Sequence, residues 1–412
     1  MKAVVHTLGC KTNQYESGAV LKKLIEHGYE VTENFEDNAD LYIINTCAVT
    51  AEAERKSRQA ARHANTLSPN ADIIIMGCAA QNAAKSFLDL PNVVAAGGIS
   101  GKVNIIERYL NGERKFFDVS VSKNYEDQSP IRSRTRSYIK AQDGCDKFCS
   151  YCIVPYLRGR SRSRSIDSIL KEIQECQSKE IVLGGIDLSD YKYEGLTFVD
   201  LVRRVGKTGA RVRISSLGVK AVTTELLEAM KEGNYCPHFH LSIQSGSNEV
   251  LKNMNRQYNS QDIIDACKLI KQYYPRAAIT SDIIAGFPME TDENHRQTLD
   301  TLEKAGLTYM HIFPYSVRAG TRAAKMPQVE KTVKRARVHD LEILREKLFD
   351  AFLKSEYGKT GEVITEQEEN GYITGHTENY IKVYLPLDTQ KDSLLKVKIG
   401  QRMRDGVQGI LI

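Results

Sequence analysis

The chain has 412 residues, of which 41% are hydrophobic and 26% charged, a composition typical of folded proteins and not of disordered ones. Its mean hydropathy is −0.39. Because no apolar run reaches about 18 residues, no membrane span is expected. The net charge of +5 is too small to indicate a nucleic-acid partner by itself. Nine cysteines without an export signal favour metal or redox chemistry in a reducing cytoplasm over a disulfide scaffold.

Short apolar strands alternate with amphipathic helices through residues 1–112. This alternation predicts an open parallel α/β sheet, in an amino-terminal domain of residues 1–113. A polar stretch, residues 113–136, is predicted to be a linker. The expected strands are Lys2–Thr7, Asp40–Asn45, Asp72–Gly77 and Val93–Gly97, and the expected helices include Tyr15–His27 and Ala51–Asn65.

A second alternation of strands and helices begins at residue 137. Six βα units in a row predict a parallel sheet that curls toward a partial (β/α)6 barrel, although a second open sheet fits the periodicity equally well. With a long helix expected over residues 330–353, this domain is assigned residues 131–356. The expected strands are Ser137–Ala141, Glu180–Leu183, Arg211–Ser215, His238–Ile243, Ala278–Ile284 and Tyr309–Phe313.

Residues 357–412 change to short strands and turns. Five such strands in a short segment predict a small carboxy-terminal β-barrel.

The strongest chemical signal is the spacing Cys145-x3-Cys149-x2-Cys152, in a loop that follows the first strand of the second alternation. A structural zinc site usually has four ligands, and no fourth cysteine or histidine lies nearby. A four-iron cluster held by three thiolates keeps one iron open for another ligand. This spacing therefore favours an iron–sulfur cluster over three unrelated cysteines.

Three further cysteines each follow a predicted strand: Cys10, Cys47 and Cys78. In a parallel sheet the carboxyl ends of the strands lie at one edge, so these residues are expected to converge there. Two roles are open for their neighbours, hydrogen bonding to cluster sulfurs or helix capping. These neighbours are Asn13, Asn45 and Thr46, whereas Glu16 is expected to be an ordinary first-turn residue of a helix. The other cysteines, Cys176, Cys236 and Cys267, are expected to be structural.

These motifs resemble the radical S-adenosylmethionine (SAM) superfamily, and within it the methylthiotransferases. TLGCKTNQYES, NTCAVT and MGCAAQ are similar to the family's amino-terminal cluster domain, and GCDKFCSYCIVPYLRGRSRSR is similar to its radical SAM loop. HLSIQSGSNEVLKNMNRQY, DIIAGFPMET and HIFPYSVRAGT match further blocks. The carboxy-terminal barrel resembles a TRAM domain, an RNA-binding module. Thr7–Glu16 resembles the branch that acts on threonylcarbamoyladenosine in tRNA.

The resemblance implies two [4Fe–4S] clusters and SAM as cofactors. Cys145, Cys149 and Cys152 would bind the cluster that cleaves SAM, and Cys10, Cys47 and Cys78 an auxiliary cluster that carries sulfur. Tyr151 would lie near the SAM adenine, and Gly184 and Gly185 near its amino end, unless these glycines only form a tight turn. Gln244 and Ser245 would contact SAM or substrate.

The implied reaction places a methylthio group at C2 of N6-threonylcarbamoyladenosine beside the anticodon of tRNA. Such an aromatic C–H bond has no useful acidity, so radical chemistry supplied by the cofactor is required. The implied partners are tRNA and a cytoplasmic electron donor such as a flavodoxin or ferredoxin. Alternatives are a methylthiotransferase for isopentenyladenosine tRNA or for a ribosomal protein side chain, and a non-enzymatic iron–sulfur sensor that binds RNA.

Charge supports an RNA partner unevenly along the chain. Residues 131–164 hold nine basic residues against two acidic ones, a net of 9 − 2 = +7, which suits phosphate oxygens. Residues 359–412 hold seven basic against eight acidic residues, so the barrel would bind RNA by local patches or shape. A substrate carboxylate calls for a cation in its pocket, and the candidates are Arg158, Arg318 and Arg322.

Overall fold

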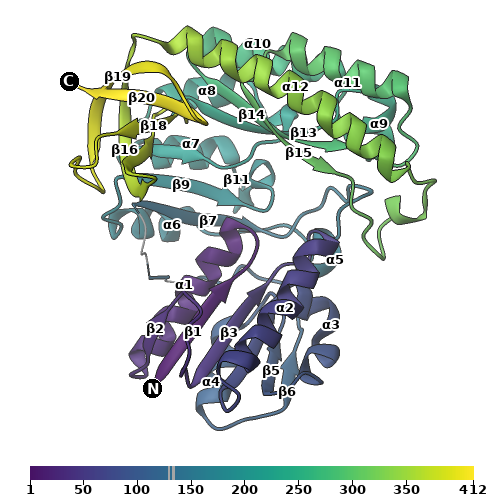
Figure 1. Ribbon diagram of the computed structural model, residues 1–412, viewed down its shortest axis with the longest axis vertical. Coiled ribbons are helices and arrows are strands. Elements are labelled where there is room, and N and C mark those ends of the chain that lie inside the picture. Colours follow the sequence, from purple (N-terminus) through teal and green to yellow (C-terminus); the bar gives the residue numbers. More distant parts are fainter. Residues whose placement is uncertain (129, 132–134) are drawn as a thin grey trace. The chain divides into compact units, whose positions relative to one another are not determined.

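The computed structural model describes residues 1–128, 130–131 and 135–412 (Figure 1). Contacts divide the chain into two compact units. The first contains Met1–Ser133, Lys140–Ser168 and Ser316–Ala324, and the second contains Arg134–Ile139, Ile169–Tyr315 and Lys325–Ile412. The basic residues Arg132 and Arg134 and part of the predicted linker lie outside the described residues.

A six-stranded parallel sheet organises the first unit and confirms the predicted open α/β sheet. Two strands escaped prediction because three residues are too few to show a period. One of them, β6, lies in the predicted linker. The order across the sheet is β2 (Glu30–Thr32), β1 (Lys2–Thr7), β3 (Leu41–Thr46), β4 (Asp72–Gly77), β5 (Val93–Gly97) and β6 (Phe116–Asp118).

Helices cover both faces of this sheet. The residues of β3 alternate between two buried clusters: Leu41 and Ile43 belong to the cluster that includes α1 and α4, and Tyr42 and Ile44 to the cluster that includes α2 and α3. The second cluster also contains Leu157 of the short helix α5, so α5 packs into the sheet's core. These helices are α1 (Lys11–Glu26), α2 (Ala51–Leu67), α3 (Cys78–Leu88), α4 (Lys102–Leu110) and α5 (Val154–Arg158).

Six strands stand in chain order and form the predicted partial barrel. β7 neighbours β9, β9 pairs in parallel with β12, and β13, β14 and β15 pair in parallel. The bridge Leu217↔Leu241 joins the two groups after β12. The strands are β7 (Arg136–Asp143), β9 (Glu180–Gly185), β12 (Val212–Ile214), β13 (His238–Gln244), β14 (Ala278–Ala285) and β15 (Tyr309–Pro314). The intervening helices are α6 (Ile166–Gln174), α7 (Phe198–Gly206), α8 (Thr224–Lys231), α9 (Asn248–Asn253), α10 (Ser260–Tyr273) and α11 (Asp292–Ala305).

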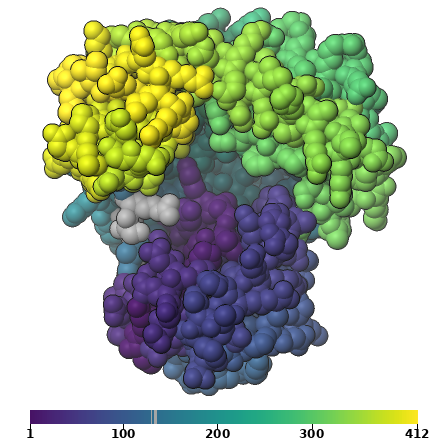
Figure 2. All heavy atoms as spheres, in the orientation of Figure 1, coloured from purple at the N-terminus to yellow at the C-terminus, as the bar shows by residue number. Residues whose placement is uncertain are grey.

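A long helix, α12 (Lys331–Glu356), leads into the closed carboxy-terminal barrel, as predicted. Leu353 near its end packs into the barrel core. Figure 2 shows the barrel in yellow as one rounded body of side chains. Its strands are β16 (Thr360–Glu369), β17 (Tyr372–His376), β18 (Lys382–Leu385), β20 (Gly406–Leu411) and β19 (Leu394–Met403). The three-domain division stays a prediction.

Buried charges tie this barrel to the other strands of the second unit. Glu180 of β9 accepts hydrogen bonds from Arg211 (3.0 Å) and Arg213 (2.8 Å). The same arginines donate to the barrel carbonyls of Glu362 and Thr377. Burial alone would raise the pKa of Glu180, but the surrounding arginines lower it to about 2. The carboxylate is therefore ionised and holds the arginines in place.

No helix in residues 1–128, 130–131 and 135–412 has the length and apolar character needed to cross a membrane.

Candidate functional site

The structure brings Cys10, Cys47 and Cys78 together at one edge of the first unit's sheet. Cys47 and Cys78 directly follow Thr46 and Gly77, which are register partners on β3 and β4. Cys10 caps the start of α1, after the neighbouring strand β1. The other two thiols both contribute to the pKa of Cys47. The predicted convergence of these residues therefore holds in the folded chain.

Burial keeps the thiols of Cys47 and Cys78 protonated in the apoprotein. It raises the pKa of Cys47 to about 11 and raises that of Cys78 as well. A bound metal replaces the thiol proton, because the thiolate and not the thiol is the ligand. The pocket therefore suits either a neutral thiol or a metal-bound thiolate.

Gly9 fits closely against Cys47. Its φ of +97° is a conformation that residues with a side chain rarely adopt. An added Cβ would lie 2.8 Å from Cys47 Cβ and 2.9 Å from Cys47 Sγ. The chain can therefore present Cys10 and Cys47 at adjacent positions only with glycine here.

Asn13, Asn45 and Thr46 use their side chains to join the strand ends. Asn13 Nδ2 donates to the carbonyls of Leu8 and Thr46, both at 2.9 Å. Asn45 Nδ2 donates to Asn13 O at 2.9 Å. Thr46 Oγ1 accepts from the backbone N–H of Ala79 (3.1 Å), in the first turn of α3. The capping role is the one observed for Thr46, on a helix that starts more than thirty residues later.

Glu16 lies at the centre of a buried charge cluster, and its expected role as an ordinary first-turn residue is wrong. Its side chain has no exposed surface. It accepts from Lys102 Nζ at 2.5 Å, Lys140 Nζ at 2.8 Å and Arg158 Nη1 at 2.9 Å. Asp143 pairs with Lys140 (2.7 Å) and Arg158 (3.0 Å). Three cations and two carboxylates thus share one buried volume, which we call the Glu16 cluster.

Electrostatics keep both carboxylates of the Glu16 cluster ionised. Burial opposes ionisation, but Arg158, Lys102 and Lys140 hold the pKa of Glu16 well below its usual value. For Asp143, Lys140 and Arg158 overcome the effect of burial and lower the pKa to about 2. Burial raises the pKa of Cys78, and the charge of Arg158 offsets part of this rise, so the charge of Arg158 reaches the thiol edge.

The second cysteine triplet lies in the loop between β7 and α5. Cys145 N donates to Gly159 O (3.1 Å) and Cys152 N donates to Cys149 O (3.0 Å), which closes the loop on itself. The loop and α5 belong to the first unit. Because α5 carries Arg158, the Glu16 cluster connects this loop's helix to α1. Both triplets are therefore parts of one compact unit.

A distant segment, Ser316–Ala324, completes this unit, and no sequence signal indicated that role. Arg318 Nη2 pairs with Glu54 of α2 at 2.9 Å. Ala323 N donates to Ser150 O, inside the cysteine loop, at 2.7 Å. The segment therefore holds both a helix beside Cys47 and the loop of the second triplet.

The residues of the second unit that are predicted to contact SAM lie at the ends of the two strands β9 and β13. Their role in binding SAM stays a prediction. Gly184 ends β9 with Gly185, and an added Cβ on Gly184 would overlap the ring of Tyr138. Gln244 ends β13 with a φ of +68°, and Ser245 N donates back to Ile243 O at 2.9 Å. This is a γ-turn of the rare, strained type. Such strain is often found at functional sites.

Tyr151 lies in the cysteine loop of the first unit, beside Cys152. Its predicted contact with the SAM adenine stays a prediction.

The basic stretch 131–164 is mostly internal, so its predicted role as a phosphate-binding surface is wrong for its buried members. The charge count left out acidic partners outside the stretch, such as Glu16 and Glu180. Among the described basic residues of the stretch, only Lys147 and Arg160 are exposed. The others are buried or half-buried and ion-paired: Arg136 with Glu180, Lys140 and Arg158 with Glu16, Arg162 with Asp143, and Arg164 with Asp127.

The remaining cysteines lie outside both triplets. Cys267 is buried in α10, and Cys236 Sγ donates to Glu180 at 3.4 Å. Cys176 follows the end of α6.

Comparison with known proteins identifies the family. Residues 139–302 match the radical SAM superfamily, and residues 2–97 match the uncharacterized protein family UPF0004. The chain is 36% identical to the threonylcarbamoyladenosine tRNA methylthiotransferase MtaB of Bacillus subtilis, over 96% of this chain and 92% of that protein. The chain belongs to the radical SAM methylthiotransferase family. It is therefore an enzyme, and the alternative of a non-enzymatic sensor is wrong.

Two further comparisons of this radical SAM methylthiotransferase concern a second kind of relative and the fold. It is 32% identical to the tRNA-2-methylthio-N(6)-dimethylallyladenosine synthase of Thermodesulfovibrio yellowstonii, over 99% of this chain and 98% of that protein. Its fold matches the radical SAM methyltransferase TsrM of Kitasatospora setae with a TM-score of 0.58 and 12% identity, covering 78% and 74% of the two chains. As a radical SAM enzyme it uses SAM and [4Fe–4S] chemistry.

Replacing Glu16 tests the Glu16 cluster. Glu16→Gln leaves Arg158, Lys102 and Lys140 buried with too little negative charge, at a cost of roughly 3 kcal/mol or more. The midpoint of urea unfolding should fall far more for this variant than for Glu26→Gln, an exposed position on the same helix.

Lowering the pH should reduce the difference in urea midpoint between Glu16→Gln and Glu26→Gln. The lowered pKa of Glu16 stabilises the fold above the pKa of the unfolded chain, about 4.3, and this contribution is lost as the pH falls toward the folded pKa. If the urea midpoint falls equally for the two variants at pH 7, Glu16 does not have a central role in stability.

Proposed function

We propose that the protein is a tRNA methylthiotransferase that converts N6-threonylcarbamoyladenosine, next to the anticodon, to its 2-methylthio derivative. The observation that carries this proposal is the full-length similarity to proteins named for that substrate, at 36% identity in Bacillus subtilis and 38% in Thermotoga maritima. Relatives named for dimethylallyladenosine match at 32%. The resemblance of Thr7–Glu16 points to the same branch.

Cys145, Cys149 and Cys152 are proposed to hold the cluster that binds SAM, and Cys10, Cys47 and Cys78 an auxiliary cluster. Cys47 and Cys78 fit this role, because they follow the register partners Thr46 and Gly77 and because burial raises the pKa of both thiols. When bound, the clusters and SAM supply the radical chemistry and the methylthio group. The chain's task is to orient these groups and exclude water.

Further residues are proposed to position SAM. Tyr151 would lie against the adenine, and Gly184 and Gly185 would receive the amino end. Gln244 and Ser245 would contact SAM or the substrate. The strained turn at Gln244 supports this role, because the surrounding structure must maintain it: Ser245 Oγ bonds Thr298 Oγ1 of α11 at 3.1 Å.

For tRNA binding, the exposed Lys147 and Arg160 beside the cysteine loop are proposed as phosphate contacts, together with the TRAM-like barrel. Lys396 and Lys398 are exposed on one face of β19 and provide the local patch that the barrel's balanced charge requires. With tRNA as the proposed substrate, the enzyme is proposed to act in the cytoplasm. A flavodoxin or ferredoxin is the proposed class of electron donor.

Arg322 is proposed as the partner of the substrate carboxylate. Of the three candidates, Arg158 is committed to Glu16 and Asp143, and Arg318 to Glu54. Arg322 is exposed, four residues after Arg318. Its guanidinium can pair with a ligand without breaking the ion pairs that hold Glu16, Asp143 and Glu54.

The two triplets should have separable roles. Anaerobically reconstituted wild-type protein should hold about eight irons per chain. Cys149→Ala should abolish both SAM cleavage and product formation. Cys47→Ala should retain part of the SAM cleavage and lose methylthiolation, as measured by chromatography of the cleavage products and mass spectrometry of tRNA nucleosides. Normal methylthiolation by Cys47→Ala would contradict the auxiliary site.

Gly9→Ala should damage the auxiliary site alone. The new Cβ would collide with Cys47, so iron content should fall from about eight to about four atoms per chain. Gly28→Ala is a matched control, since Gly28 also has a positive φ (+78°) but no atom within 4 Å of the added Cβ. If both variants load iron equally, close packing at Gly9 does not govern cluster binding.

Substrate choice is tested with purified enzyme and tRNA carrying either modified adenosine. The expected 2-methylthio product appears only from the threonylcarbamoyl form. Arg322→Met should raise KM for that tRNA about tenfold, the effect of about 1.4 kcal/mol in binding. Lys325→Met, an exposed cation three residues on, should change KM little. Turnover of the isopentenyl form alone would overturn the substrate, whereas equal KM values for both variants would exclude only Arg322.

A further inference from the structure

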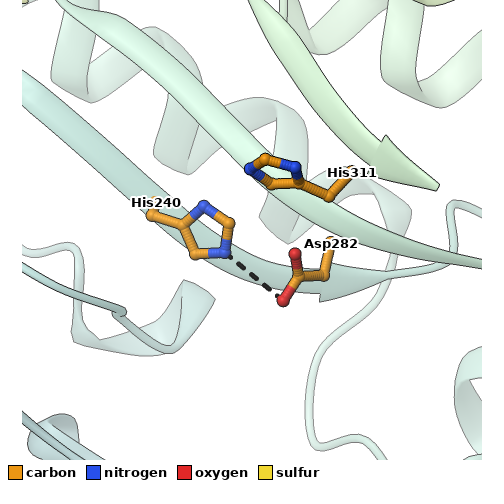
Figure 3. Close-up of side chains that lie close together, drawn as sticks. All are labelled: His240, Asp282 and His311. Atoms are coloured by element: carbon orange, nitrogen blue, oxygen red, sulfur yellow. Dashed lines mark ion pairs between the residues drawn. The ribbon is translucent and has the colours of Figure 1, made fainter. Parts of the chain in front are cut away.

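A group of two histidines and one aspartate lies on β13, β14 and β15 of the second unit. The residues are His240, Asp282 and His311, one on each strand (Figure 3). Asp282 and His311 are register partners, and His240 is the register partner of Thr280, two residues before Asp282. Because side chains alternate along a strand, all three project from the same face of the sheet.

The opposite face carries the hydrophobic core of these strands. Each of the three polar residues has a fully buried hydrophobic neighbour in the chain: Leu241 after His240, Ile283 after Asp282 and Met310 before His311. His240 and Asp282 are half-buried, and His311 is exposed. The group is therefore a polar set on the face opposite the core, and it is accessible to a small ion.

The spacing of His240 and Asp282 suits one shared ion better than a direct contact. One ligand atom from each residue lies within 4.8 Å of the other two. The distance between His240 Nε2 and Asp282 Oδ2 is 3.5 Å. This is longer than the roughly 2.7–2.9 Å that is usual for a charge-assisted hydrogen bond. Two ligands at about 2.1 Å from a tetrahedral zinc ion lie about 3.4 Å from each other.

A neighbouring hydroxyl orients His240 for such a role. Thr280 Oγ1 lies 2.9 Å from His240 Nδ1. With Nδ1 bound to this hydroxyl, Nε2 is directed toward Asp282, as the dashed line in Figure 3 shows. Metal-binding histidines usually have their second ring nitrogen fixed by a hydrogen bond in this way.

From this geometry we propose that His240, Asp282 and His311 bind one divalent transition-metal ion, of which zinc is the reference case. Two imidazoles and one carboxylate are ligands that zinc and Fe²⁺ share, and zinc binds such sets more tightly than Fe²⁺. Three protein ligands leave a coordination position for water or an oxygen of a bound molecule. None of the three ligands is a cysteine of either triplet, and the proposal does not depend on the proposed tRNA substrate.

The test uses the anaerobically reconstituted holoenzyme and zinc sulfate as the probe. After one equivalent of zinc is added and the protein is dialysed, mass spectrometry of the metals should find about one zinc per chain besides iron. Absorption at the zinc K-edge should show only nitrogen and oxygen ligands, at about 2.0–2.1 Å. The iron of the clusters does not contribute at that edge.

Variants assign the zinc to this group. His240→Ala and His311→Gln should each lower the affinity for zinc at least tenfold while iron content and melting temperature stay unchanged. His27→Ala, an exposed histidine at the end of α1, should bind zinc as the wild type does. His311→Gln keeps the test valid if His240→Ala fails to fold, because His311 is exposed. Absence of retained zinc in the wild type, sulfur ligands at the zinc edge, or undiminished binding by His311→Gln would overturn the proposal.

Discussion

A carboxylate with no contact to solvent, Glu16, fixes the arrangement of the first unit. Lys102, Lys140 and Arg158 come from α4, β7 and α5, and all three end on its two oxygens. A buried charge is tolerated only when it is fully paired. If one of these elements moved, Glu16 or one of its cations would be left buried without its partner. The cysteine loop and the edge with Cys10, Cys47 and Cys78 are consequently set by the same few ion pairs.

Hydrogen bonds extend this constraint to the strand ends. Lys102 donates to Asn45 as well as to Glu16, and Arg158 donates to Asn13 as well as to Glu16. Asn13 also donates to the carbonyl of Thr46, next to Cys47, and Asn45 donates to the carbonyl of Asn13, so the charges and the thiol edge form one connected network. Rigid support of this kind is what precise placement of a reactive group requires. A polar interior thus replaces part of the hydrophobic packing around this site.

The sequence predicted the elements that repeat and missed the contacts that do not. Strands such as β1 and β4 were predicted to the residue, since each is a continuous apolar run with a clear end. The same parallel-sheet rule brought Cys10, Cys47 and Cys78 to one edge. Ion pairs between residues far apart in the chain, however, cannot be recognised from the sequence around either partner. The partner of Arg158, Glu16, lies 142 residues away, so a count of charges in residues 131–164 suggested a basic surface where the structure has salt bridges.

The discontinuous first unit has a consequence for biosynthesis. Its last part, Ser316–Ala324, comes after a long stretch that belongs to the second unit. Domains usually fold as units while the chain emerges from the ribosome, starting from the amino terminus. Here the unit with both cysteine triplets cannot be complete until residue 324 of 412 has been synthesised. Under the proposed cluster roles, insertion of iron and sulfide into the complete unit follows the synthesis of residues 169–315, which belong to the second unit.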